Sequence, residues 1–106
     1  MTRSILFAAS LLLAAPVPAE ESAGTVTVTI AQFAFSPAQL TVKAGSKVIW
    51  HNQDETPHNV VANDKSFASP ALDEGESFAV TFDKPGSYGY FCRLHPHMTG
   101  SVTVTP

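Results

Sequence analysis

Charged residues and cysteine are both scarce in this sequence. Only 14% of its 106 residues are charged, the formal net charge is −3, and the chain has one cysteine, Cys92. Surfaces that bind nucleic acids carry clustered Lys and Arg, so this composition argues against a nucleic-acid partner. A lone cysteine cannot form a disulfide within the chain, which excludes the cross-links that stabilise many small exported domains.

The apolar run near the N-terminus, residues 5–15, is too short to span a bilayer comfortably. Arg3 precedes it, and residues 17–19 end in the small side chain that a signal peptidase favours. We therefore predict a signal peptide over residues 1–19 and a mature domain over residues 20–106. The expected location is the periplasm, without stable membrane insertion. A buried N-terminal helix is the alternative, but a polar stretch follows the run at once.

The single thiol of Cys92 needs an explanation of its own. In an oxidising compartment a free thiol oxidises or exchanges unless it is buried or capped. An intermolecular disulfide, simple burial and metal binding are the explanations that the cysteine count leaves open.

Sustained helical periodicity is absent after residue 20. Apolar and polar residues instead alternate with period two, as in half-buried strands. Seven runs have this pattern: residues 25–30, 40–42, 48–50, 59–61, 78–82, 88–92 and 101–104. Because turn residues separate these runs, we predict an all-β fold, a Greek-key β-sandwich of about seven or eight strands. Residues 62–73 are the least regular and are expected to form a loop or a short helix.

Large aromatic residues at strand positions predict a packed core between two sheets. These residues are Trp50, Phe33, Phe35, Phe78, Phe82 and Tyr90. We expect Trp50 and most of the others to lie in this core. Tyr88, at the start of a strand, is a candidate corner residue that bonds to a loop backbone.

A C-x2-H-x2-M triplet, formed by Cys92, His95 and Met98, follows the predicted strand 88–92. A tight loop through Pro96 would bring the three side chains to one point. Thiolate, imidazole and thioether are soft to intermediate ligands that suit copper better than calcium, magnesium or manganese, and a thioether is a poor zinc ligand. A blue-copper centre also needs a second histidine, because it is a trigonal His2Cys site with a weak axial Met.

Two upstream histidines compete for this second position. His58 follows Pro57 where a polar turn enters a predicted strand, whereas His51 ends a strand, where a polar side chain normally faces water. We favour His58 over His51. His97 lies between two candidate ligands and is expected to point outward.

These features together resemble the cupredoxins, and most closely the amicyanin and plastocyanin group. The resemblance covers nearly the whole predicted mature chain and rests on these segments: FAFSP (33–37), LTVKAG (40–45), VIW (48–50), PHNV (57–60) and PGSYGYFC (85–92). The C-x2-H-x2-M spacing is similar to that of amicyanin, whereas plastocyanin has more residues between His and Met. The fold that this resemblance implies is a cupredoxin-like β-sandwich.

The resemblance implies that His58, Cys92, His95 and Met98 bind one type 1 copper ion. It also implies that the backbone amide of Asn59 donates a hydrogen bond to the Cys92 sulfur. In this scheme Cys92 is the strong thiolate ligand, Met98 the weak axial ligand and His95 the solvent-edge ligand through which electrons pass. His58 anchors the metal from the buried side.

The function that follows is single-electron transfer by Cu(II)/Cu(I) cycling rather than enzyme catalysis, since protein ligands fill every position on the metal. We expect a monomer that meets redox proteins such as a c-type cytochrome or a periplasmic dehydrogenase. The alternative is a periplasmic copper scavenging or delivery protein. Acidic residues could steer a basic cytochrome, but we favour an ordinary solvated face as their explanation. They are Asp54, Glu55, Asp73, Glu74 and Glu76.

Overall fold

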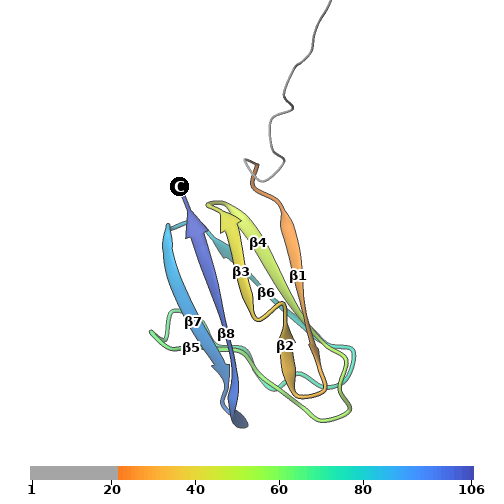
Figure 1. The fold of residues 1–106 in the computed structure, drawn as a ribbon. Coiled ribbons are helices and arrows are strands. Elements are labelled where there is room, and N and C mark those ends of the chain that lie inside the picture. Colours follow the sequence, from red (N-terminus) through yellow and green to blue (C-terminus); the bar gives the residue numbers. More distant parts are fainter. Residues whose placement is uncertain (1–21) are drawn as a thin grey trace, which may run out of the picture.

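The computed structural model describes residues 22–106, which form an all-β sandwich of two four-stranded sheets (Figure 1). The strands are β1 (Thr25–Ala31), β2 (Ala34–Ser36), β3 (Gln39–Lys43), β4 (Ser46–Asn52), β5 (Val61–Ala62), β6 (Ser77–Phe82), β7 (Gly86–Cys92) and β8 (His95–Thr105). The predicted fold class is therefore confirmed. The predicted signal peptide, residues 1–19, lies outside the described residues.

The first sheet has the strand order β2-β1-β4-β6, with β1 parallel to β4 and antiparallel to β2. Its alternating sequence places Val28 and Ile30 of β1, and Val48 and Trp50 of β4, in the core with no exposed surface. The register sets Val28 directly opposite Trp50. This alternation is the period-two pattern that the sequence predicts. The short strand β2 is not among the seven predicted runs, although its central residue, Phe35, was expected at a strand position.

The second sheet has the order β3-β8-β7-β5. In it β7 and β8 form an antiparallel hairpin, whose turn lies at the end of the sandwich away from the C-terminus (Figure 1). The sequence pattern predicted a last strand over residues 101–104, but β8 begins at His95. It is longer because pairing with β7 continues through Phe91 and Thr99 to Cys92 and His95, across an irregularity after Phe91. The candidate ligands Cys92 and His95 therefore lie on paired strands.

The core between the sheets is aromatic. Trp50 is fully buried and packs edge-on against Tyr90, at 5.3 Å between ring centroids, and Tyr90 contacts Phe35 in the same way. Replacing a fully buried Trp by Ala costs about 3–5 kcal/mol, so this cluster is a main source of stability. Phe33 is the exception to the core prediction, because 49% of its surface is exposed.

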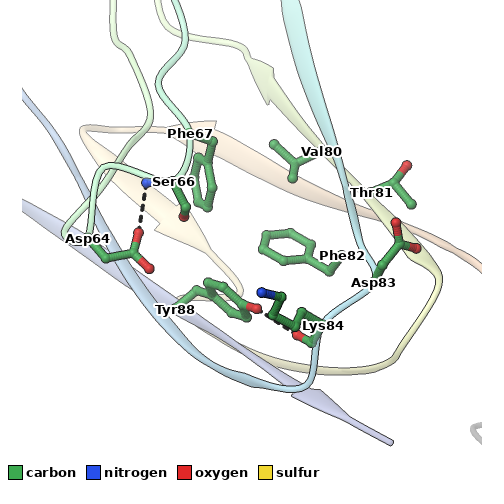
Figure 2. A pocket seen from close by; sticks show the side chains of 9 residues that line it. All are labelled: Asp64, Ser66, Phe67, Val80, Thr81, Phe82, Asp83, Lys84 and Tyr88. Atoms are coloured by element: carbon green, nitrogen blue, oxygen red, sulfur yellow. Dashed lines mark hydrogen bonds between the residues drawn. The ribbon is translucent and has the colours of Figure 1, made fainter.

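Tyr88 acts as the expected corner, because its hydroxyl donates a 2.6 Å hydrogen bond to the carbonyl of Lys84. Figure 2 shows this bond at the edge of a cavity of about 410 Å³ that the side chains of Phe67 and Phe82 also line. None of the four candidate copper ligands lines this cavity. The described residues include no helix with the length and hydropathy that crossing a bilayer requires.

Of the predicted irregular segment 62–73, Ala62 ends β5 and residues 63–73 form an irregular loop without a helix. The predicted strand over residues 59–61 is reduced to β5, Val61–Ala62, although Asn59 and Val60 are buried. The loop is tied to the chain before β5 by an antiparallel bridge between His58 and Leu72. It is tied again by the Ser69 hydroxyl, which accepts a 2.9 Å hydrogen bond from the Val60 amide. The segment that carries His58 is thus fixed by the loop rather than by a sheet.

Candidate metal centre

The C-x2-H-x2-M triplet is carried by the β7–β8 hairpin. Cys92 is the last residue of β7, His95 is the first residue of β8, and the two are directly paired. Only Arg93 and Leu94 lie between them. The prediction of a loop through Pro96 was wrong, since Pro96 already belongs to β8.

Three of the predicted ligands come together at this hairpin. The Cys92 Sγ lies 3.8 Å from Nδ1 of His58 and 3.7 Å from Nδ1 of His95. Within residues 22–106 these three form the one group of His, Cys, Asp or Glu side chains arranged to hold a metal ion, with ligand atoms within 4.8 Å of one another. Met98, three residues further along β8, is 5% exposed and packs in the core.

The distances fit a metal ion bound by all three side chains. Bonds of about 2.0 Å to nitrogen and about 2.3 Å to sulfur, at the angle of a trigonal site, separate the two donor atoms by about 3.7 Å. The observed sulfur–nitrogen separations match this value. Two imidazoles, a thiol and a buried thioether are the donors of a blue-copper site, and zinc sites rarely use the thioether.

His58 is held rigidly from several sides. It is fully buried, and its backbone exchanges two hydrogen bonds with Leu72, of 3.2 and 2.7 Å. Its Nε2 lies 2.8 Å from Oδ2 of Asp54. Because a carboxylate only accepts hydrogen bonds, we assign the ring proton to Nε2, which leaves the lone pair of Nδ1 directed to Cys92.

No sequence pattern indicated this role for Asp54, which was predicted only as part of an acidic surface. Its carboxylate also accepts hydrogen bonds from the backbone amides of Gln32 and Phe33, at 2.7 and 2.9 Å. Partial burial raises the pKa of Asp54, but the amides of Phe33 and Gln32 and the His58 imidazole outweigh it, so the net pKa is lowered. The carboxylate is therefore charged at neutral pH and joins the β1–β2 turn to a candidate ligand, His58.

Asn59 joins the His58 segment to the hairpin. Its backbone amide donates to the Cys92 sulfur at 3.4 Å, as the resemblance implied. Its side-chain Oδ1 also accepts a 2.7 Å hydrogen bond from the Arg93 amide, which the sequence analysis missed. This pair of bonds fixes the thiol of Cys92 relative to His58, and such outer contacts set both ligand orientation and metal potential.

His95 has fewer attachments. Its imidazole is only partly buried. In the described part of the chain its Nε2 has no hydrogen-bond partner, and its ring contacts are with Phe33 and His58, at centroid distances of 4.9 and 5.0 Å. The open side of this ring is the expected solvent edge of the site.

The remaining histidines lie outside the cluster. His51, on β4, shares a 2.7 Å hydrogen bond with the Ser77 hydroxyl of β6. His97 is exposed, as predicted. The choice of His58 over His51 agrees with this geometry.

A His-Cys-His cluster with a buried methionine, at one end of a two-sheet β-sandwich, defines the class of small blue-copper domains. The chain belongs to the cupredoxin-like family, since the family model of the cupredoxin-like domain matches residues 4–104.

The amicyanins and plastocyanins are among its relatives. Amicyanin-alpha of Methylorubrum extorquens is 38% identical over 90 residues, which cover 80% of this chain and 76% of that protein. Plastocyanin of Scenedesmus fuscus is 39% identical over 83 residues, covering 66% of this chain and 85% of that protein. The likeness therefore extends well beyond the ligand loop.

Solved structures agree. A Cu(I) structure of an amicyanin variant has a TM-score of 0.72 at 32% identity and covers 76% of this chain and 82% of that chain. A purple cupredoxin from Nitrosopumilus maritimus has a TM-score of 0.71 at 32% identity, covering 76% and 99%.

Proposed function

We propose that this protein is a small exported type 1 copper protein that carries single electrons between periplasmic redox partners. His58, Cys92, His95 and Met98 are the proposed ligands of one copper ion. The observation that carries the proposal is the position of the Cys92 sulfur between two imidazole nitrogens at matching distances of 3.8 and 3.7 Å. In this proposal the domain comprises residues 20–106 and follows a signal peptide over residues 1–19.

Each ligand is prepared by its surroundings. Asp54 holds the His58 ring in the tautomer that offers Nδ1. The Asn59 amide stabilises negative charge on the Cys92 sulfur, and burial of Met98 keeps its thioether away from water. When bound, copper supplies a one-electron couple between Cu(II) and Cu(I).

Rigid ligands suit an electron carrier, because a site that changes little between oxidation states transfers electrons with little rearrangement. The His58–Leu72 bonds hold the His58 segment against the loop after β5, and the Asn59–Arg93 bond joins that segment to the hairpin that carries Cys92. A delivery protein instead needs ligands that open readily to release the ion. The full burial of His58 and Cys92 therefore favours electron transfer over copper delivery.

A docking surface for redox proteins surrounds His95. Its large apolar members are Phe33 and Leu94, each 49% exposed, and the exposed residues Pro57, Pro96 and His97 extend it. Electron-transfer encounters are brief and bury little area, so a patch of this kind is sufficient for a monomer meeting a c-type cytochrome or a periplasmic dehydrogenase.

The visible spectrum of the copper-loaded protein tests the proposal. We expect one equivalent of Cu(II) to give an intense sulfur-to-copper charge-transfer band, and we expect Cys92→Ser to abolish that band. His51→Ala is the matched control, since it removes a histidine outside the cluster and should leave the band unchanged. A wild-type protein that takes up copper without the band would refute the type 1 site. Copper release within seconds to a weak chelator would favour the delivery function.

A further inference from the structure

Phe33, His58 and His95 form a closed group of three rings. Phe33 lies 4.9 Å from each imidazole, centroid to centroid, with an interplanar angle of 87° in both pairs. The two imidazoles are 5.0 Å apart. Edge-to-face contact at these distances is the favoured geometry for aromatic pairs. A side chain expected in the core thus stands at the surface against both histidines of the site.

The backbone at Phe33 adopts an unfavourable conformation to reach this position. Gln32 and Phe33 are the two residues of the β1–β2 turn, and both have positive φ, 54° and 59°. Two-residue hairpin turns of this kind strongly favour Asn and Gly, because other side chains are strained at positive φ. A phenylalanine here is unfavourable for the turn itself, and strain of this type often accompanies function.

Asp54 fixes this turn. One carboxylate oxygen accepts a 2.7 Å hydrogen bond from the Gln32 amide, and the other accepts a 2.9 Å hydrogen bond from the Phe33 amide. The second oxygen also accepts a 2.8 Å hydrogen bond from Nε2 of His58. Asp54 itself is oriented by Asn52, whose side-chain oxygen accepts the Asp54 amide at 3.0 Å. The Phe33 backbone and the His58 ring therefore share a single anchor.

His95 depends on this arrangement more than His58 does. His58 is fully buried and hydrogen-bonded, whereas the Nε2 of His95 has no partner among the described side chains and backbone groups. Apart from the approach of its Nδ1 to Cys92, its ring is restrained by Phe33 and His58. Removing the Phe33 ring would leave His58 as the one remaining ring in contact with the His95 imidazole among the described residues.

We propose that Phe33 is a positioning residue that holds the His95 imidazole beside Cys92 and slows loss of the metal, with Asp54 as its anchor. This inference rests on the proposed copper site. It adds to the site a residue that is not a metal ligand, and it explains why a phenylalanine occupies a turn position with positive φ.

The test compares Phe33→Asn with Leu94→Asn. Phe33 and Leu94 are each 49% exposed in the wild type. Each variant therefore removes one large, half-exposed apolar side chain close to His95. Asn tolerates positive φ, so Phe33→Asn keeps the turn and removes only the ring. Phe33→Tyr retains the ring and serves as the conservative rescue.

Two measurements separate positioning from folding. The first is the NMR order parameter of the His58 and His95 ring carbons, measured in the metal-free protein. The second is the rate at which a Cu(I) chelator in excess removes the metal. We expect Phe33→Asn to lower the order of the His95 ring alone and to speed copper loss about tenfold, the size expected for losing aromatic contacts. Phe33→Tyr and Leu94→Asn should behave like the wild type.

Equal effects of Phe33→Asn and Leu94→Asn, or an unchanged His95 ring in Phe33→Asn, would overturn the proposal. A thermal melt of each metal-free variant shows whether it folds. If Phe33→Asn failed to fold, Asp54→Asn would replace it, since it releases the anchor and leaves the ring in place. Failure of the wild type to form the charge-transfer band would defeat the copper site itself, while the ring measurement would still decide the role of Phe33.

Discussion

The two histidines of the site offer the same nitrogen, Nδ1, to Cys92, but they are held in different ways. His58 is fully buried, hydrogen-bonded to Asp54 and bridged through its backbone to Leu72. His95 begins β8, is partly exposed and relies on ring contacts. The difference shows that one candidate ligand belongs to the core of the fold and the other to its surface.

This asymmetry suits an electron carrier. A buried, hydrogen-bonded ligand keeps the geometry constant, because moving it would break several contacts at once. A ligand at the surface brings the metal close to a partner protein. The first role needs rigidity and the second needs access, and a single histidine could not provide both.

Replacing each histidine by Ala should give the largest difference between His58 and His95. In the metal-free protein we expect His58→Ala to lower the free energy of unfolding by about 3 kcal/mol, because it leaves a buried cavity and removes a hydrogen-bond donor from Asp54. His95→Ala should cost about 1 kcal/mol or less, as its ring is partly exposed. Urea unfolding measures both values, and equal losses would show that the two histidines are equally embedded.

Asn59→Ala tests the connection between the two ligand segments. The Arg93 amide, whose bond to Asn59 is partly buried, loses its acceptor, so we expect a loss of about 1 kcal/mol and faster hydrogen exchange at Arg93. Asn63→Ala, an exposed position on the neighbouring loop, is the control and should change stability by less than about 0.5 kcal/mol. Unchanged exchange at Arg93 in Asn59→Ala would show that the bond does not join the segments.

Asp54→Asn tests how far the Asp54 hydrogen bond restrains His58, because it weakens that bond and leaves the histidine in place. The substitution keeps the size of the side chain and removes its charge, and its amide nitrogen cannot accept a hydrogen bond. We expect a loss of about 1 kcal/mol and faster exchange of the His58 Nε2 proton in NMR spectra. Glu55→Gln, exposed on the same turn, should change neither quantity.

The smallest effect is expected at His97, two residues after His95 on β8. Its side chain is exposed, so His97→Ala should change stability by less than about 0.5 kcal/mol and leave the visible band of the copper form unaltered. Its effect should appear only in the rate of electron exchange with a partner. A shifted band would place His97 closer to the metal than its exposure indicates.

Local patterns predicted most of the fold. Alternation over residues 25–30 and 78–82 identified β1 and β6, and turn residues marked the loops, because both signals arise from neighbours in the chain. The start of β8 was missed, since His-Pro-His has no strand alternation and pairs only because β7 lies beside it. Phe33 was missed for a similar reason: nothing near it in the sequence indicates that Asp54, 21 residues away, holds it at the surface.

The sequence by itself determined the β-sandwich class and the chemistry of the candidate ligands, because strand periodicity and donor atoms are properties of individual residues and their neighbours. The tertiary structure decided how each ligand is held: His58 by Asp54, the sulfur by the Asn59 amide and His95 by the Phe33 ring. Most of these contacts join segments more than 20 residues apart, and they exist only after the two sheets have packed. The family resemblance implied that His58 is buried and His95 lies at the solvent edge, but the contacts that produce this difference could not be predicted from residue types.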